Sequence, residues 1–224
     1  MPLLSSDAAA VLAHDGFRAA ILSPAFACVA GAAAVRAGNY RFASFPALGE
    51  PGSIAELAAG LREFIAEFPL SPELFATYVA SFREPGSLSP AAFESLLWDT
   101  LQGLHDLDTV GWDPAVSRDP DDPAFSFSFH GRSFFIVGMH PGADRWTRRL
   151  AWPTLVFNAH DQFEQLRRAG RYGPLQRTIR RREQRLQGSY NPMLDDHGSQ
   201  SEARQYSGRM VDAGWRCPFH SREA

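Results

Sequence analysis

Residues 126–138 read SFSFHGRSFFIVG, and this stretch predicts the centre of the fold. Aromatic residues alternate with serines from Phe125 to Phe129, which is the period of a half-buried strand. His130-Gly131 is typical of a tight turn, and the apolar run that follows it is typical of a returning strand. We therefore expect a β-hairpin here.

The sequence after the hairpin predicts a further strand. Residues 153–157 read PTLVF, and we expect Asn158 to cap a helix that extends to about Ala169 and is stopped by Gly170. We also expect helices in the first forty residues, with a break at Ser23-Pro24, and a strand over 40–45. A Ser53/Glu56 capping box predicts the start of a helix that ends at Pro69. Two further helices are expected, one opened by Ser89-Pro90 and one from Pro174 to about Gly188. Residues 74–82 fit a strand or a helix, and 106–123 are expected to form a long loop.

Helices and strands alternate without a regular βαβ rhythm, which predicts an α+β fold. We expect a mixed, mainly antiparallel sheet packed with several helices. A chain of 224 residues fits a single domain over residues 1–224, with about 1–20 and 218–224 peripheral.

Composition narrows the classes of function. The formal charge is −3, which gives no overall attraction to nucleic acid or acidic membranes. All 22 basic residues are arginine. Two cysteines are too few for a disulfide framework, and we expect no secretory signal in the acidic start. We expect a cytoplasmic protein.

Two histidines stand where expected strands end, and three arginines lie between them. His140 precedes Pro141-Gly142, His160 falls in the first turn of its helix, and the arginines are Arg145, Arg148 and Arg149. Neutral imidazole is a common ligand of transition metals and haem iron, and guanidinium groups suit carboxylates. The set fits an iron porphyrin with two propionates better than a bare ion. Each histidine also fits a plain hydrogen-bonding role.

Other features allow further interpretations. Eleven arginines between 145 and 185 could form a nucleic-acid-binding face, although a solvated helix face explains them as simply. Cys217 could serve as a thiolate ligand, whereas Cys28 fits a buried apolar thiol.

Several stretches of the chain, taken in order, resemble the YqcI/YcgG family. They are 135–141 (FIVGMHP), Arg145 with Arg148-Arg149, 153–164 (PTLVFNAHDQFE), Ile179-Arg180, Gly188-Ser189, 191–194 (NPML), 201–203 (SEA), 205–209 (QYSGR) and 215–219 (WRCPF). The resemblance runs from about residue 20 to the end. The chain departs from it at Ala27-Cys28 and 31–33 (GAA), where the family has a proline-cysteine followed by Gly-Ala-Lys.

The resemblance implies a haem protein. Characterised relatives are haem-dependent N-oxygenases of natural-product pathways, among them a guanidine N-hydroxylase of the guanitoxin pathway. Expected here is a haem b monooxygenase that N-hydroxylates or N-oxidises an amine or guanidine, with dioxygen or peroxide as oxidant. An electron-donor protein and a homodimer are conceivable partners, and no membrane or nucleic acid is expected.

The resemblance and the residues together suggest roles. His160 is the first choice of axial ligand, then His140, then Cys217. Arg145, Arg148 and Arg149 would pair with propionates, and Asn158, Gln162 and Tyr206 would orient the ligand or bound oxygen. The alternatives are a haem-binding or haem-sensing protein without turnover, and an arginine-rich nucleic-acid-binding module.

Overall fold

A five-stranded sheet forms the middle layer of the computed structural model, which describes residues 7–69, 75–189, 191 and 200–222. Its strand order is β1-β2-β5-β4-β3, where the strands are β1 (Tyr40–Ala47), β2 (Thr77–Glu84), β3 (Phe127–Phe129), β4 (Arg132–Met139) and β5 (Thr154–Ala159). Only β1 and β2 are parallel, and the other three neighbouring pairs are antiparallel. The mixed, mainly antiparallel sheet expected from the sequence is confirmed.

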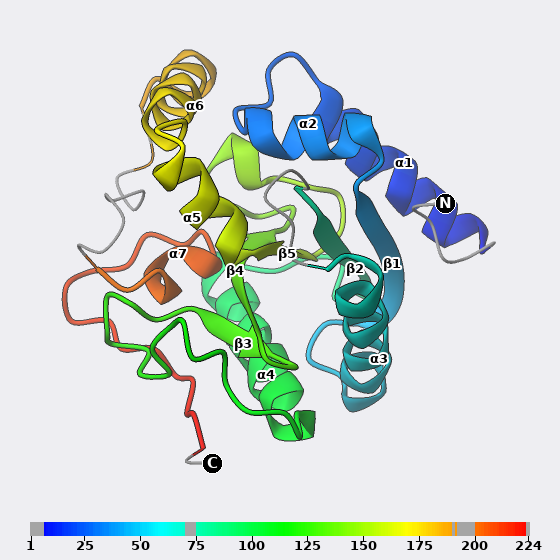
Figure 1. The fold of residues 1–224 in the computed structure, drawn as a ribbon. Coiled ribbons are helices and arrows are strands. Elements are labelled where there is room, and N and C mark those ends of the chain that lie inside the picture. Colours follow the sequence, from blue (N-terminus) through cyan, green and yellow to red (C-terminus); the bar gives the residue numbers. More distant parts are fainter. Residues whose placement is uncertain (1–6, 70–74, 190, 192–199, 223–224) are drawn as a thin grey trace.

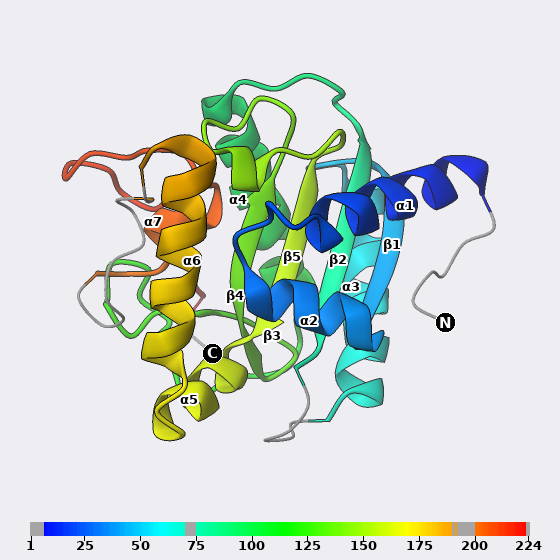
Figure 2. The ribbon, with the colours of Figure 1, turned by 90° about the horizontal axis from the view of Figure 1, so that it is seen from above.

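Helices cover both faces of this sheet (Figures 1 and 2). One face carries α3 (Pro51–Glu67) and α4 (Pro90–Leu107). The other carries α1 (Ala8–Leu22), α2 (Val29–Ala37) and α6 (Tyr172–Gln187), with α5 (His160–Arg168) leading into α6. The short helices η1 (Trp146–Arg148) and α7 (Ala203–Tyr206) complete the structure. In the described part of the chain, no helix is both long enough and apolar enough to cross a bilayer.

The hairpin predicted from residues 126–138 is confirmed. His130 and Gly131 both have positive φ (53° and 73°), and Phe127 pairs with Phe134. Two consecutive residues with positive φ match the twist of antiparallel strands, which is why a His-Gly pair serves at this turn.

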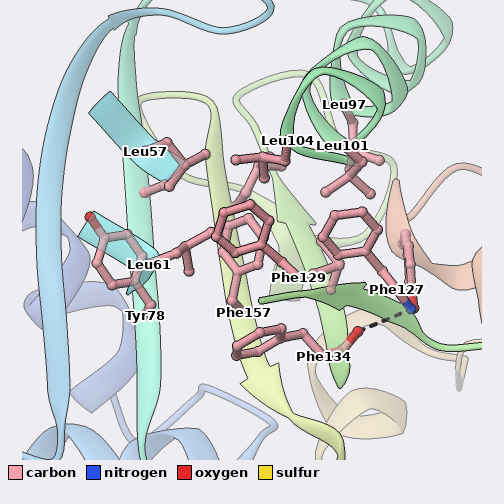
Figure 3. Packing of buried hydrophobic residues seen from close by; sticks show 14 of the residues in the cluster. Leu57, Leu61, Tyr78, Leu97, Leu101, Leu104, Phe127, Phe129, Phe134 and Phe157 are labelled. Atoms are coloured by element: carbon pink, nitrogen blue, oxygen red, sulfur yellow. Dashed lines mark hydrogen bonds between the residues drawn. The ribbon is translucent and has the colours of Figure 1, made fainter. Parts of the chain in front are cut away.

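The larger core lies between the sheet and helices α3 and α4 (Figure 3). Alternate residues of the strands point into it, including Phe134 on β4 and Phe157 on β5. They meet Leu57 of α3 and Leu101 of α4, all of them fully buried. Because side chains of a strand alternate between its two faces, the intervening residues of β4 and β5 face the opposite layer.

Both ends of the chain contribute to packing. Phe17 of α1 is 5% exposed and joins a second core beneath α1 and α2, while Phe219 is 2% exposed and packs on Trp98 in the first core. The sequence predicted that both ends of the chain are peripheral. Of these ends, residues 1–6 and 223–224 lie outside the described residues.

Two expected helix starts were wrong, and α6 begins at Tyr172 rather than at the expected Pro174. α3 begins at Pro51 and is capped by Glu50, whose carboxylate accepts from the N–H groups of Gly52 and Ser53, rather than by the box at Ser53. Asn158 is no cap, because β5 extends through Ala159 and α5 starts at His160 without a side-chain cap. The ambiguous segment 74–82 contains most of strand β2, and residue 74 lies outside the described residues.

Gly138 on β4 tests how tightly the sheet packs on α4. A Cβ there would lie 2.6 Å from Cε1 of Phe93, 2.8 Å from the carbonyl oxygen of Tyr206 and 2.9 Å from Cδ1 of Leu97. We expect Gly138→Ala to lower the free energy of unfolding by about 1–3 kcal/mol, because a full core has to be forced apart. Urea denaturation measures it. Gly111→Ala, with nothing within 4 Å of its Cβ, is the control and should stay within about 0.5 kcal/mol.

Candidate functional site

A cavity of about 260 Å³ lies between the sheet and the helical layer formed by α2, α5 and α6. Its floor is the face of β4 and β5 turned away from the larger core, with Phe135, Val137 and Val156 among its residues. Ligand sites commonly measure about 300–1,000 Å³, so the volume of this cavity lies just below the usual range for small-molecule sites.

Small side chains on α2 help to leave this space open. Ala30, Gly31 and Ala34 of α2 line one part of the cavity wall, and Leu175 and Ile179 of α6 line another. The walls are therefore largely apolar, and the polar groups that interrupt them stand out.

His160, the first residue of α5, is one of those polar groups. Its side chain is 12% exposed, and it lies between two carboxylates. Nδ1 is 3.6 Å from Oε2 of Glu202, and Nε2 is 3.7 Å from Oε1 of Glu164. Burial lowers the pKa of His160, but Glu202 and Glu164 raise it by more, so the pKa of this imidazole lies above its ordinary value.

Glu202 is itself held in place by two hydroxyl groups. Its Oε1 accepts hydrogen bonds from Ser126 Oγ at 2.7 Å and from the Tyr206 hydroxyl at 2.5 Å. The Tyr206 hydroxyl in turn accepts from the backbone N–H of Phe127 on β3 at 3.1 Å. Burial, together with the charge of Glu202, raises the pKa of Tyr206 well above its ordinary value, so the phenol stays protonated and donates.

Asn158 and Gln162 both line the cavity, as the sequence suggested. Asn158 Oδ1 accepts from Thr77 Oγ1 at 3.2 Å, and its amide nitrogen donates to the carbonyl of Phe135 at 3.3 Å. Gln162 Nε2 donates to the carbonyl of Ala76 at 2.9 Å. Each side-chain amide is thus anchored through its nitrogen, and its oxygen has a lone pair that can accept a further hydrogen bond. Tyr206 is fully buried behind Glu202 and does not line the cavity.

The three arginines after His140 have different surroundings. Arg148 lines the cavity, but its guanidinium donates to the carbonyls of Gly138, Gln205 and Tyr206. Burial lowers the pKa of Arg148 to about 10, which leaves it charged at neutral pH.

Arg145 and Arg149 do not line the cavity. Arg145 donates to the backbone and hydroxyl oxygens of Ser189 and lies 3.8 Å from Glu183, and Arg149 donates to the carbonyl of Ala143. Two arginines that the sequence did not single out, Arg167 and Arg180, do line it.

His140 and Cys217 lie away from the cavity. His140 is 1% exposed and stacks on Phe93 of α4 with the ring centroids 4.3 Å apart. Burial lowers the pKa of His140, so the ring is neutral at pH 7. Cys217 packs against the larger core, and burial raises its pKa to about 12.

Cys28 and Glu202 are cavity residues to which the sequence reasoning gave no role there. Cys28 lines the cavity at the start of α2, and its sulfur accepts from the N–H of Gly31 at 3.4 Å. The motif containing Glu202, residues 201–203, was visible only as a family resemblance. In the described ranges, no three or more His, Cys, Asp or Glu side chains gather in a way that could hold a bare metal ion.

The arginine-rich helix predicted after residue 170 is α6. Its inner side turns Leu175, Ile179 and Glu183 to the cavity, and Arg182 donates to the carbonyl of Phe26 at 3.0 Å. Arg177, Arg181 and Arg185 are exposed, which is the ordinary arrangement of an amphipathic helix.

A family model of the YqcI/YcgG family matches residues 17–220. The chain belongs to the YqcI/YcgG family. YcgG of Bacillus subtilis (strain 168), named as an uncharacterized protein, is 28% identical over 204 residues, which cover 87% of this chain and 80% of YcgG. No solved structure shows significant similarity to the chain.

A second relative, from Streptomyces lavendulae, has a name that provisionally assigns it as an N(omega)-hydroxy-L-arginine synthase, DcsA. It is 26% identical over 159 residues, covering 68% of this chain and 60% of DcsA. YqcI of Bacillus subtilis (strain 168), also named as uncharacterized, is 24% identical over 163 residues, covering 70% of this chain and 64% of YqcI. The match thus spans less than two thirds of DcsA and of YqcI.

The two thiols should be unreactive in the folded protein. Burial raises the pKa of both Cys28 and Cys217, and only the thiolate reacts with alkylating agents. We expect iodoacetamide at pH 8 to label neither cysteine in the folded protein and both cysteines in about 8 M urea, a concentration that unfolds most small domains. Mass spectrometry of tryptic peptides measures it. Fast labelling of Cys28 in the folded protein would mean that the cavity exposes a thiolate.

Proposed function

We propose that this protein is a haem-dependent oxygenase that N-hydroxylates or N-oxidises a guanidine or amine group of a small molecule. The family and the name of DcsA support the reaction class. The observation that carries the proposal is the imidazole of His160 in the wall of an apolar cavity, at the start of a helix beside the sheet.

The residues around the cavity fit a haem. His160 would hold the haem iron through one ring nitrogen, while its other nitrogen would keep a carboxylate partner, as Nδ1 has in Glu202. Apolar side chains on β4, β5 and α6 suit the faces of a macrocycle. Among the described residues, Arg167 and Arg180 are cations at the cavity wall that would pair with propionates, whereas the guanidinium of Arg148 is committed to three backbone carbonyls.

Arg145 and Arg149 are less suited to propionates, because their guanidinium groups are engaged outside the cavity. His140 and Cys217 are in turn less suited to be axial ligands than His160, since both pack in or against the core.

The bound haem would supply the activation of dioxygen or peroxide. The chain itself would hold the group through His160 and exclude water with the phenylalanines and valines of the cavity floor. Asn158 and Gln162 line the cavity, and their side-chain amide oxygens would accept from the N–H groups of a guanidine or amine.

Binding of hemin tests the cofactor. We expect the purified protein to take up one hemin with a Soret band, and His160→Ala to lose most of that affinity, because the axial bond is removed. A hemin titration followed by a pyridine haemochrome assay measures this. His220→Ala changes an exposed histidine and should match the parent. A parent that takes up no hemin, or a His160→Ala variant with unchanged binding and spectrum, contradicts the proposal.

Turnover tests the reaction. With L-arginine as probe and hydrogen peroxide, or dioxygen with a chemical reductant, we expect an N-hydroxylated product by mass spectrometry. Gln162→Leu removes an acceptor of one hydrogen bond, worth about 0.5–1.5 kcal/mol, and should lower kcat/KM roughly 2- to 13-fold with an unchanged Soret band. A protein that binds hemin but oxidises no guanidine or amine would be a haem carrier or sensor.

A further inference from the structure

Charge is divided unevenly along this chain. Residues 160–188, which span α5 and α6, carry eight arginines against three acidic residues, a formal charge of +5 with histidine neutral. The rest of the chain carries 14 arginines against 22 acidic residues, a formal charge of −8. The charge distribution is therefore strongly polarised although the net charge is only −3, and a field of this kind orients a charged partner as it approaches.

Three of these arginines form a row along the outer side of α6. Arg177, Arg181 and Arg185 follow one another at four-residue steps, and all three are exposed. At about 1.5 Å per residue, neighbouring members of this arginine row are about 6 Å apart along the helix axis. None of them forms an ion pair with a carboxylate of the described residues, whereas the exposed Arg222 lies 3.0 Å from Asp106.

The exposed side of α6 carries charge of one sign only. Exposure by itself is ordinary on an amphipathic helix, but such a face usually mixes acidic and basic residues. The exposed residues of α6, all of which the structure describes, are the arginine row with Pro174 and Gln184. Like charges four residues apart repel and destabilise a helix, so this pattern does not serve the stability of α6. It fits an anionic partner instead.

The helix α6 is also the wall between the arginine row and the cavity. Leu175, Ile179 and Glu183 on its inner side line the cavity, and Figure 2 shows α6 in front of the sheet. An α-helix with its side chains is about 10–12 Å across. A protein docked on the arginine row would therefore lie one helix thickness from a cofactor in the cavity.

The proposed reaction with dioxygen needs electrons from outside the protein. When an N–H group becomes N–OH, one atom of dioxygen enters the new N–O bond and the other leaves as water. The balance takes one N–H group, one dioxygen, two electrons and two protons to one N–OH group and one water. Each turnover thus consumes two electrons, which a carrier protein delivers one at a time.

We propose that the arginine row is the docking surface for an acidic one-electron carrier protein, of the flavodoxin or [2Fe–2S] ferredoxin type. This rests on the proposed function and adds the source of its electrons. Carboxylates of the carrier would pair with the guanidinium groups of the row, which suit them through parallel hydrogen bonds. The negative charge on the rest of the chain would turn the carrier away from the other faces.

The charge distribution favours such a carrier over a nucleic acid. A nucleic acid also binds rows of arginine through its phosphates. It is a long polyanion, however, and would extend past the row onto a molecule whose remaining residues have a formal charge of −8. A compact acidic protein can contact the row alone, because redox partners meet over small interfaces.

Binding to the haem-free protein tests the surface separately from the cofactor. We expect a flavodoxin or a plant-type [2Fe–2S] ferredoxin to bind the parent, more weakly as salt rises toward about 0.15 M. The double variant Arg177→Glu/Arg181→Glu should weaken that binding at least about 10-fold, because like charges then face each other. Isothermal titration calorimetry measures the affinities.

A control variant makes the same change of charge elsewhere. Arg118→Glu/Arg216→Glu alters two exposed arginines outside α5 and α6 and should stay within about 2-fold of the parent. Glutamate and arginine have similar helix propensities, so the row variant should keep its fold, which far-UV circular dichroism checks. The neutral variant Arg177→Gln/Arg181→Gln should weaken binding by less than the acidic one.

Electron delivery is the second readout. With hemin bound, reduction by the photoreduced carrier in a stopped-flow instrument should slow at least about 10-fold in Arg177→Glu/Arg181→Glu, in step with the weaker docking. Reduction by dithionite, a small molecule that needs no docking surface, should proceed at the parent's rate. Slower reduction by dithionite as well would mean that the substitutions disturb the cofactor rather than the docking.

The outcomes separate this inference from the function on which it rests. A parent that takes up hemin but binds neither carrier, or a row variant that binds them as the parent does, overturns the inference alone. Tighter binding of a single-stranded DNA oligonucleotide than of either carrier, lost in the row variant, would make the row a nucleic-acid surface. A parent that takes up no hemin overturns the proposed function and this inference together.

Discussion

The register between β4 and β5 is the constraint on which the rest of the molecule depends. Ile136 pairs with Phe157, and Phe135 pairs with Asn158. The first pair points into the larger core and the second pair lines the cavity. A slip of one residue would exchange the two faces of either strand, burying the amide of Asn158 in the core and moving Phe157 to the cavity. The same pairing thus determines both the stability of the core and the chemistry of the cavity.

The C-terminal part of the chain depends on that sheet for its position. Tyr206 of α7 lies behind β3 and β4, accepting from the N–H of Phe127 and placing its hydroxyl 3.3 Å from the carbonyl of Phe134. Glu202, one turn earlier, reaches Ser126 across 76 residues of sequence. A buried carboxylate needs such partners, and they exist only after β3 has joined the sheet. His160 therefore gains its nearest fixed charge from tertiary structure, not from neighbours in the sequence.

This dependence explains how much could be predicted from the sequence. The alternation of Phe127 and Phe129 with serines, and the His130-Gly131 turn, report local backbone preferences, and the hairpin followed from them directly. The placement of Asn158 in a strand rather than at a cap did not follow, because pairing with Phe135 extends β5 by a residue that local propensity assigns to a helix start. The mixed, mainly antiparallel sheet was predictable as a class, but the parallel pairing of β1 with β2 was not.

Some residues of the candidate site could likewise be predicted from the sequence, and others could not. His160, Asn158 and Gln162 could be found because they follow one strand-like run closely, whereas the roles of Arg145 and Arg149 depend on Ser189 and Ala143, and only tertiary structure reveals those partners. Arg167 and Arg180 reach the cavity because α5 and α6 fold back over the sheet. Nothing in the local sequence around the eleven arginines between 145 and 185 distinguishes Arg167 and Arg180 from the arginines that are exposed.

The departure of this chain from the family at residues 27–33 can be understood from α2. Counted from Cys28, the position of the family's lysine is Ala33, which is exposed and is not part of the cavity wall, whereas Cys28, Gly31 and Ala34 are. On a helix, residues three and four positions apart share a face, as Gly31 and Ala34 or Ala30 and Ala34 do, and Ala33 is turned about 100° away from Ala34 toward solvent. The side chain at position 33 leaves the helix toward solvent from its first atom. Replacing a lysine by alanine there leaves the wall of the cavity as it is, and Cys28, which both patterns share, is the N-cap of α2 and lines the cavity.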